Sequence, residues 1–193
     1  MNLSEMTLDE LWELFPIILE EHNTAYVDWY AEEKNNLLNC IQRKNIKRIN
    51  HIGSSAVKGL ISKPTIDILL EIDKESDTEN LKYILDINGW ILMFEENEPD
   101  FKIVFNKGYT PEGFAPKVYH LHIRYFGDCD ELYFRDYLLA RDDVAKDYGN
   151  LKLELIKQYK HDRDGYTKAK TEFVLKHTQK ARKEFGDKYS PES

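Results

Sequence analysis

The chain has 193 residues, of which 35 are acidic and 27 basic, giving a net charge of −8 at pH 7. This length allows one domain with a buried core. The acidic balance argues against a broad nucleic-acid surface or an anionic-membrane surface, since both depend on an excess of lysine and arginine.

Targeting and thiol chemistry are also disfavoured. Residues 1–14 lack a basic signal region, and no apolar run approaches about 20 residues, so we predict a cytoplasmic protein with no membrane partner. The two cysteines, Cys40 and Cys129, form no CxxC pair. This spacing disfavours a disulfide or a metal-thiolate site.

The N-terminal segment is predicted to form two helices. Thr7 and Glu10 have the spacing of a capping box, so a first helix begins there and stops near Pro16. Thr24 is predicted to cap a second helix, because apolar residues recur at helical spacing over residues 27–41.

Two strands are predicted next, at residues 46–52 and 64–72. Alternation in the second strand separates an apolar face from a mixed one. The mixed face carries Thr65, Asp67, Leu69 and Glu71. Residues 76–88 then return to helical spacing, and Gly89 is well placed to end that helix.

The middle of the chain is predicted to add three more strands, at residues 90–94, 101–106 and 118–126. Alternation in the last of them places His120, His122 and Arg124 on one face. Residues 107–117 hold two glycines and two prolines, which predicts a long surface loop.

The C-terminal third is predicted to be helical, over residues 132–140, 144–159 and about 166–185. Residues 186–193 are expected to be frayed.

Several short motifs together carry a family resemblance. They are LFPI at 14–17, HIGSSAV at 51–57, KPTIDI at 63–68, GYT at 108–110, HLH at 120–122, FRDYL at 134–138, and residues 148–152. The chain resembles the GrpB family, small bacterial proteins assigned to the nucleotidyltransferase superfamily. The resemblance implies the fold class α+β, in a single domain over residues 1–193. It implies a nucleotidyltransferase-like mixed sheet flanked by helices over about 1–127, and a helical C-terminal region over about 128–186.

The turn at residues 53–55 has the composition of a phosphate-binding turn. Gly53 allows the backbone to approach an anion, while the Ser54 and Ser55 hydroxyls and successive backbone N–H groups can hold phosphate oxygens. The alternative is a strand-to-helix turn in which Ser54 is only a cap. Asp67 in the next strand favours phosphate binding.

Asp67 is the candidate catalytic carboxylate and metal ligand. Two-metal nucleotidyl transfer uses carboxylates at positions i and i+2 of one strand face, but the residues two away from Asp67 are Thr65 and Leu69. Glu71 is four residues on, so at ~3.3 Å per residue its Cα lies about 13 Å away. The alternative for Asp67 is a buried acid bonded to backbone or histidine.

His120 and His122 lie two apart on one strand face, with Cβ atoms about 7 Å apart. With Asp67 they are predicted to hold a divalent ion, Mg²⁺ or Mn²⁺, and to be catalytic. The alternative is a pair of hydrogen-bonded histidines in a polar groove. Lysines and one arginine are predicted to lie near phosphate, with Arg135 the best because its planar fork is bidentate. They are Lys63, Arg135, Lys152 and Lys170.

Two functions follow from these residues and from the resemblance. The first is a nucleotidyltransferase-like protein that binds a nucleotide or another phosphorylated small molecule, with metal-assisted nucleotidyl or phosphoryl transfer if it turns over. The second is a non-catalytic accessory domain linked to dephospho-CoA kinase and coenzyme A metabolism, since a similar domain is fused to that kinase in some family members. Leu69, in place of a second carboxylate, favours the second function.

Overall fold

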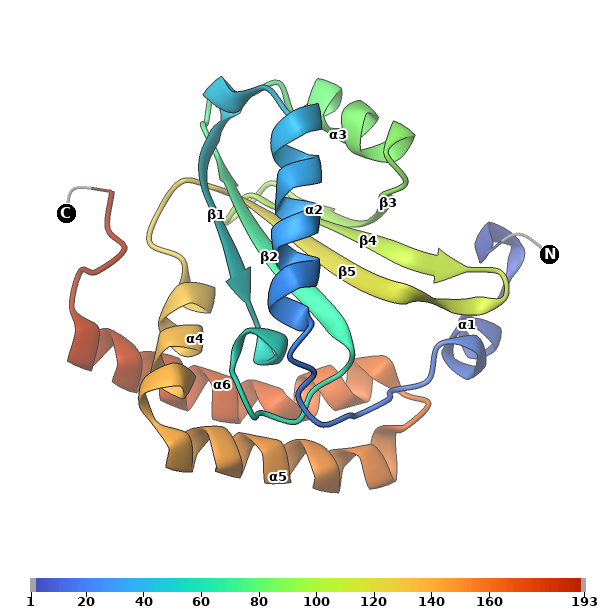
Figure 1. Cartoon of the computed structure of the whole chain (residues 1–193), viewed down its shortest axis with the longest axis vertical. Helices are drawn as coiled ribbons and strands as arrows, with labels where there is room; N and C mark the ends of the chain where they lie inside the picture. The colour runs from blue at the N-terminus through green and yellow to red at the C-terminus, as the bar shows by residue number, and fades with distance from the viewer. Residues whose placement is uncertain (1–2, 192–193) are drawn as a thin grey trace.

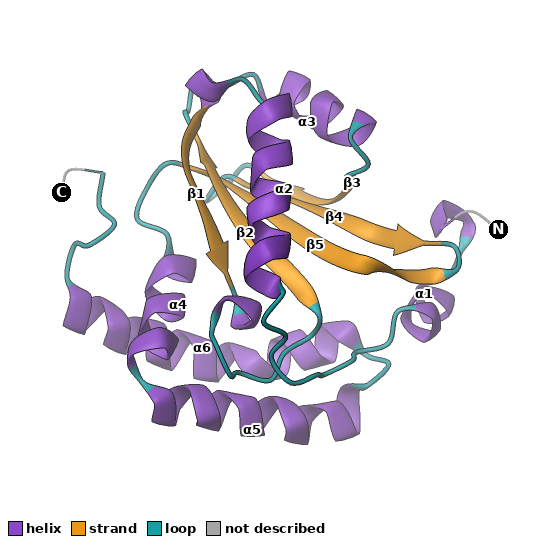
Figure 2. Ribbon diagram, in the orientation of Figure 1, coloured by secondary structure: helices purple, strands orange, loops and turns teal. Residues whose placement is uncertain are grey.

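The computed structural model describes residues 3–191, which form one mixed five-stranded sheet in the order β1-β2-β5-β4-β3. The strands are β1 (Ile46–Ile52), β2 (Thr65–Ile72), β3 (Ile91–Glu96), β4 (Lys102–Thr110) and β5 (Gly113–Tyr125). The central pair, β2 and β5, is parallel, and the other neighbours are antiparallel. Figure 2 shows the strands as one continuous twisted layer.

Helices cover the sheet and extend beyond one end of it. They are α1 (Leu8–Leu14), α2 (Tyr26–Cys40), α3 (Thr78–Ile87), α4 (Asp130–Ala140), α5 (Asp142–Tyr159) and α6 (Arg163–Phe185). In Figure 1, α2 lies along the sheet, and α5 and α6 lie side by side below the point where β1 ends and β2 begins. The predicted α+β class, with a mixed sheet and a helical C-terminal region, is confirmed. Within the described chain, none of these helices is both long and apolar enough to cross a bilayer.

One face of the sheet forms the main core, as the alternation in β2 and β5 predicts. Ile66, Ile68 and Leu70 are fully buried and pack with α2 and α3. Burying each such side chain stabilises the fold by about 1.5–3 kcal/mol. This core fixes β2 and β5 side by side.

The opposite face carries the polar residues. The parallel register places Asp67 beside His120, and Leu69 beside His122. Leu69 packs with Ile52 and with Leu132 of α4, so α4 covers the middle of this face. The start of β2 is left facing α5 and α6.

The caps of the first two helices differ from each other. The predicted capping box is present, because Thr7 Oγ1 accepts the Glu10 N–H at 3.3 Å and Glu10 Oε2 accepts the Thr7 N–H at 2.8 Å. The predicted Thr24 cap is wrong. Asn23 Oδ1 accepts the Ala25 N–H at 2.9 Å, so an asparagine closes the turn and Ala25 occupies the cap position without a side-chain bond.

The long loop predicted over residues 107–117 is also wrong. β4 runs to Thr110, and β5 begins at Gly113, so only Pro111 and Glu112 lie between them. Gly108 has φ +92° where the pairing register shifts, and a side chain there would meet the Lys117 backbone. The glycines and prolines that suggested a loop form a bulge and a hairpin turn.

The segment predicted to be frayed is packed in its described part. The Tyr189 ring lies edge-on to Tyr133, with centroids 5.3 Å apart. Its hydroxyl donates to Asp136 and accepts from Arg135 at 3.0 Å. One aromatic anchor therefore ties the C-terminal segment to α4. Residues 192–193 lie outside the described chain.

Candidate functional site

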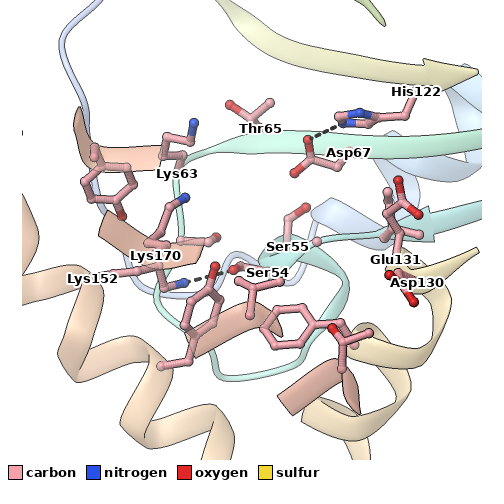
Figure 3. A pocket seen from close by; sticks show the side chains of 18 of the residues that line it. Ser54, Ser55, Lys63, Thr65, Asp67, His122, Asp130, Glu131, Lys152 and Lys170 are labelled. Atoms are coloured by element: carbon pink, nitrogen blue, oxygen red, sulfur yellow. Dashed lines mark hydrogen bonds and ion pairs between the residues drawn. The ribbon is translucent and has the colours of Figure 1, made fainter. Parts of the chain in front are cut away.

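A cavity of about 430 Å³ opens where the polar face of the sheet meets the C-terminal helices. Figure 3 shows that it draws its lining side chains from the turn after β1, from β2 and β5, and from α4, α5 and α6. We call it the lysine cavity because Lys63, Lys152 and Lys170 line it. Five further predicted site residues line it, Gly53, Ser54, Ser55, Asp67 and His122, whereas His120 and Arg135 do not.

Asp67 lies between the two histidines. Its Oδ1 is 3.3 Å from His120 Nδ1 and 3.2 Å from His122 Nε2. The ligand atoms of the three residues all lie within 4.8 Å of one another. Two imidazole nitrogens and a carboxylate suit Mn²⁺ or another first-row transition metal better than Mg²⁺, which prefers oxygen ligands.

On the side away from Asp67, His120 contacts Tyr109 and Arg163, which were not predicted as site residues from the sequence. Its Nε2 lies 2.8 Å from the Tyr109 hydroxyl and accepts a hydrogen bond from Arg163 at 3.1 Å. A guanidinium can only donate, so Nε2 must accept and Nδ1 carries the proton that points at Asp67. Burial lowers the pKa of His120 to about 4, so the ring is neutral near pH 7.

Asp67 is consequently an ionised carboxylate in a half-buried position. Burial by itself raises its pKa, but the hydrogen bonds with His120 and His122 outweigh it and hold the pKa well below the usual range. Asp67 and His122 also line the lysine cavity. They are the members of the trio best placed to meet a ligand.

Gly53 places the backbone of the turn against this carboxylate. It has φ +70° and ψ −173°, a conformation reserved for glycine. A Cβ at this position would lie 2.6 Å from Asp67 Oδ2. Gly53 was predicted to let the backbone approach a bound anion, and it lets the backbone approach the Asp67 carboxylate.

The two serines of the turn have different partners. Ser54 Oγ accepts a hydrogen bond from Lys152 Nζ at 2.9 Å, and Ser55 Oγ lies 3.0 Å from His51 Nε2. Ser54 makes no capping bond, because Gly53 occupies the cap position and the following turn, η3 (Ser54–Ala56), is a 3-10 turn of three residues. The alternative of Ser54 as a helix cap is therefore wrong.

Three lysines from separate parts of the chain face the same space. Lys63 precedes β2, Lys152 belongs to α5, and Lys170 belongs to α6 (Figure 3). Burial lowers the pKa of Lys63 and of Lys152 to about 7, and that of Lys170 to about 8. In the part of the chain that the structure describes, the ammonium groups of Lys63 and Lys170 form no hydrogen bond or ion pair. A bound anion would stabilise the charged form of all three.

The rest of the lining adds a free donor and little free negative charge. Tyr166 is 1% exposed, and its hydroxyl has no hydrogen-bond partner among residues 3–191. Asp130 and Glu131 line the cavity, but Asp130 pairs with Arg182 at 2.5 Å and Glu131 pairs with Arg124 at 3.0 Å. The cavity therefore suits an anion that accepts hydrogen bonds.

Arg135, predicted as the best phosphate ligand, does not line the cavity. Its guanidinium donates to Asn50 Oδ1 at 3.2 Å, to the His51 carbonyl at 3.1 Å, to Asp136 at 2.9 Å and to the Tyr189 hydroxyl at 3.0 Å. These contacts tie α4 to β1 and to the C-terminal segment. The planar guanidinium that could bind a phosphate therefore binds oxygen atoms of the protein instead.

The remaining acid on this face of β2 is also engaged. The Glu71 side chain is fully buried, and Arg48 binds it with two hydrogen bonds of 2.5 and 2.7 Å. Leu69 is fully buried in an apolar cluster. Glu71 therefore neutralises Arg48 and does not act as a second carboxylate beside Asp67.

Comparisons with known proteins agree on one family. The sequence model described as GrpB protein matches residues 16–180 of this chain. The glutamate-rich protein GrpB of Alkalihalophilus pseudofirmus is 34% identical over 161 residues, covering 82% of this chain and 91% of that protein. A UPF0157 protein of Pseudomonas aeruginosa is 36% identical over 129 residues, which are 66% of this chain and 52% of the relative.

A solved structure supports the same relationship. The crystal structure of the conserved protein GrpB from Enterococcus faecalis matches this fold with a TM-score of 0.76 and 28% sequence identity. The match covers 87% of this chain and 99% of that chain. The likeness therefore extends over most of the chain.

Proposed function

The chain belongs to the GrpB family, and we propose that it binds a phosphorylated small molecule and a divalent metal ion in the lysine cavity. One observation carries the proposal: Lys63, Lys152 and Lys170 converge with Asp67 in a single cavity of about 430 Å³. The nucleotide predicted from the sequence is one member of this ligand class.

In this proposal the lysines recognise the phosphate. Lys152 is 3% exposed and already donates to Ser54, so it brings the serine hydroxyl and its own ammonium to one place. The free Tyr166 hydroxyl adds a neutral donor. Charge-assisted hydrogen bonds of this kind are the strong ones in proteins, and they strengthen further in a buried site.

The ion would be held by Asp67 and His122, with His120 as the third ligand. His120 Nδ1 carries the proton given to Asp67, so its ligation would require that proton to move to Nε2 and Arg163 to give up its hydrogen bond there. The ion would neutralise phosphate charge and polarise a phosphoryl oxygen. Among the ions predicted from the sequence, we favour Mn²⁺ over Mg²⁺ because two of the three ligands are imidazoles.

If turnover occurs, we propose phosphoryl or nucleotidyl transfer assisted by one ion. Leu69 stands where a second carboxylate would be needed for two ions. The lysines would then stabilise negative charge on the transferred group, and Asp67 would fix the ion. Asp67→Ala is expected to abolish both ion binding and transfer.

The test is calorimetric titration of inorganic pyrophosphate, with and without Mn²⁺, into the wild type and three variants. Lys152→Met should weaken pyrophosphate binding by about 10- to 100-fold, the value of a hydrogen bond to a charged group. Lys157→Met is the matched control, because Lys157 lies on the same helix but is exposed and pairs with Glu154. Asp67→Asn should remove the dependence on Mn²⁺. Equal affinities in the wild type and Lys152→Met would reject the proposal.

A second candidate is a binding role without turnover, which the buried Leu69 favours. In that case the chain would act as an accessory domain, and dephospho-CoA kinase is the partner suggested by the family resemblance. Co-purification with that kinase that survives Asp67→Ala and Ser54→Ala would support the accessory role. Loss of the complex in either variant would instead assign the interaction to the cavity.

A further inference from the structure

A second cavity of about 270 Å³ adjoins the first and differs from it in chemistry. Its lining includes four aromatic residues, Phe15, Trp29, Tyr109 and Phe114, together with prolines such as Pro64 and Pro116. We call it the aromatic cavity. Its residues come from the segment after α1, from α2, from the β4–β5 hairpin and from the approach to β2.

The two cavities share part of their walls. Lys63 and Thr65 line both of them. Arg163 lines the aromatic cavity and donates to His120, which contacts Asp67. A ligand in the aromatic cavity would therefore have one end beside the groups proposed to bind phosphate and metal.

The aromatic side chains are positioned to receive a flat apolar group. Phe114 remains 37% exposed, although its ring packs at 5.1 Å against Phe15 and at 5.3 Å against Tyr109. Trp29 is half-buried. Aromatic faces in a partly open cavity favour stacking with another ring, which is tolerant of ring type.

The lining holds three charged residues, the acid Glu20 and the bases Lys63 and Arg163. Lys63 and Arg163 are its cations, and the Lys63 ammonium has no hydrogen bond or ion pair with any described residue. An apolar ring alone would leave this ammonium unpaired, and a phosphate alone would leave the rings exposed. A single ligand with a ring and a phosphate group satisfies both cavities.

We propose that the aromatic cavity binds the planar heteroaromatic ring of the same ligand whose phosphate groups occupy the lysine cavity. The ligand class is then a nucleotide, with its base near Phe114 and Trp29 and its phosphates near Lys63. This inference rests on the proposed function, because the lysine cavity must bind phosphate for the two parts to be joined.

The experiment compares ATP with inorganic tripolyphosphate, both titrated at a fixed Mn²⁺ concentration. The wild type should bind ATP roughly 5- to 100-fold more tightly than tripolyphosphate, the range expected for one base stacked on an aromatic side chain. Phe114→Ala should remove this preference without changing the affinity for tripolyphosphate. Phe114→Leu keeps an apolar side chain in the hairpin, so it should also lose the preference while remaining folded.

Phe94→Ala is the control, because Phe94 is another exposed phenylalanine, 49% exposed, on β3 at the far edge of the sheet. It should leave both affinities unchanged. Tripolyphosphate binding without any preference for ATP would overturn the ring site and leave the proposed function standing. A preference that survives both Phe114 variants would also overturn it. If neither compound binds to the wild type, the proposed function fails and the ring site fails with it.

Discussion

Gly53→Ala is the substitution that tests the geometry around Asp67 most directly. Glycine is required there for two separate reasons. Its φ of +70° with ψ of −173° belongs to the region that other residues occupy only at about 1–3 kcal/mol. A Cβ would also lie 2.6 Å from Asp67 Oδ2, well inside van der Waals contact.

The second effect has a definite energetic consequence. Asp67 is fixed by His120 at 3.3 Å and by His122 at 3.2 Å, so moving the carboxylate breaks at least one of these hydrogen bonds. Loss of a hydrogen bond to a charged group costs about 1.5–3 kcal/mol. We therefore expect Gly53→Ala to lower the free energy of unfolding by about 3–5 kcal/mol.

Gly59→Ala is the matched control. Gly59 has a similar φ of +79°, but a Cβ there would meet nothing within 4 Å. This variant should lose only the backbone term, about 1–2 kcal/mol. The difference between the two variants reports the contact with Asp67 together with any difference in backbone strain between the two glycines.

Urea denaturation of the wild type and both variants measures these free energies, and Mn²⁺ titration of the folded proteins measures the effect on the site. Gly53→Ala should weaken Mn²⁺ binding and Gly59→Ala should not. Equal urea midpoints and slopes for the two variants, together with unchanged Mn²⁺ affinity, would refute the close approach of Gly53 to Asp67.

Three further predictions concern the charged groups around the site. The folded-state pKa of Lys152 is about 7 against an unfolded value of 10.5, so between these values the unfolded chain binds more protons and the free energy of unfolding rises with pH. The slope of the unfolding free energy against pH is up to about 1.36 kcal/mol per pH unit. Lys152→Met should reduce this slope in urea titrations from pH 7 to 10. An unchanged slope would contradict the lowered pKa of Lys152. Arg135→Met should destabilise the fold by about 2–4 kcal/mol and leave the pyrophosphate affinity unchanged. Loss of pyrophosphate affinity with unchanged stability would show that Arg135 binds the ligand. Arg48→Met leaves buried Glu71 without its partner and should cost about 3–5 kcal/mol in urea denaturation, and adding Glu71→Gln should restore part of that loss; no restoration would show that the arginine acts through packing.

The local part of the site follows from the sequence. Strand alternation has a period of two residues, so it assigns Asp67 to the face opposite Ile66 and Ile68, and it assigns His120 and His122 to one face. The same local logic gives the Thr7–Glu10 capping box. This local reasoning fails where pairing with another segment, and not the local sequence, decides the role of a glycine. Gly108, which looked like part of a loop, lies in a bulge of the β4–β5 hairpin.

The tertiary structure alone decides which of these faces meet and what surrounds them. The parallel pairing of β2 with β5 brings Asp67 to His120, although 52 residues separate them along the chain. Lys152 reaches Ser54 from 98 residues away, and Arg163 reaches His120 through the start of α6. Arg135, equally cationic, is directed to protein oxygens by the packing of α4 on β1. Local sequence patterns determine which face of a strand a residue lies on and where helices are capped. The contacts between distant residues depend instead on how whole helices and strands bury their apolar surfaces against each other.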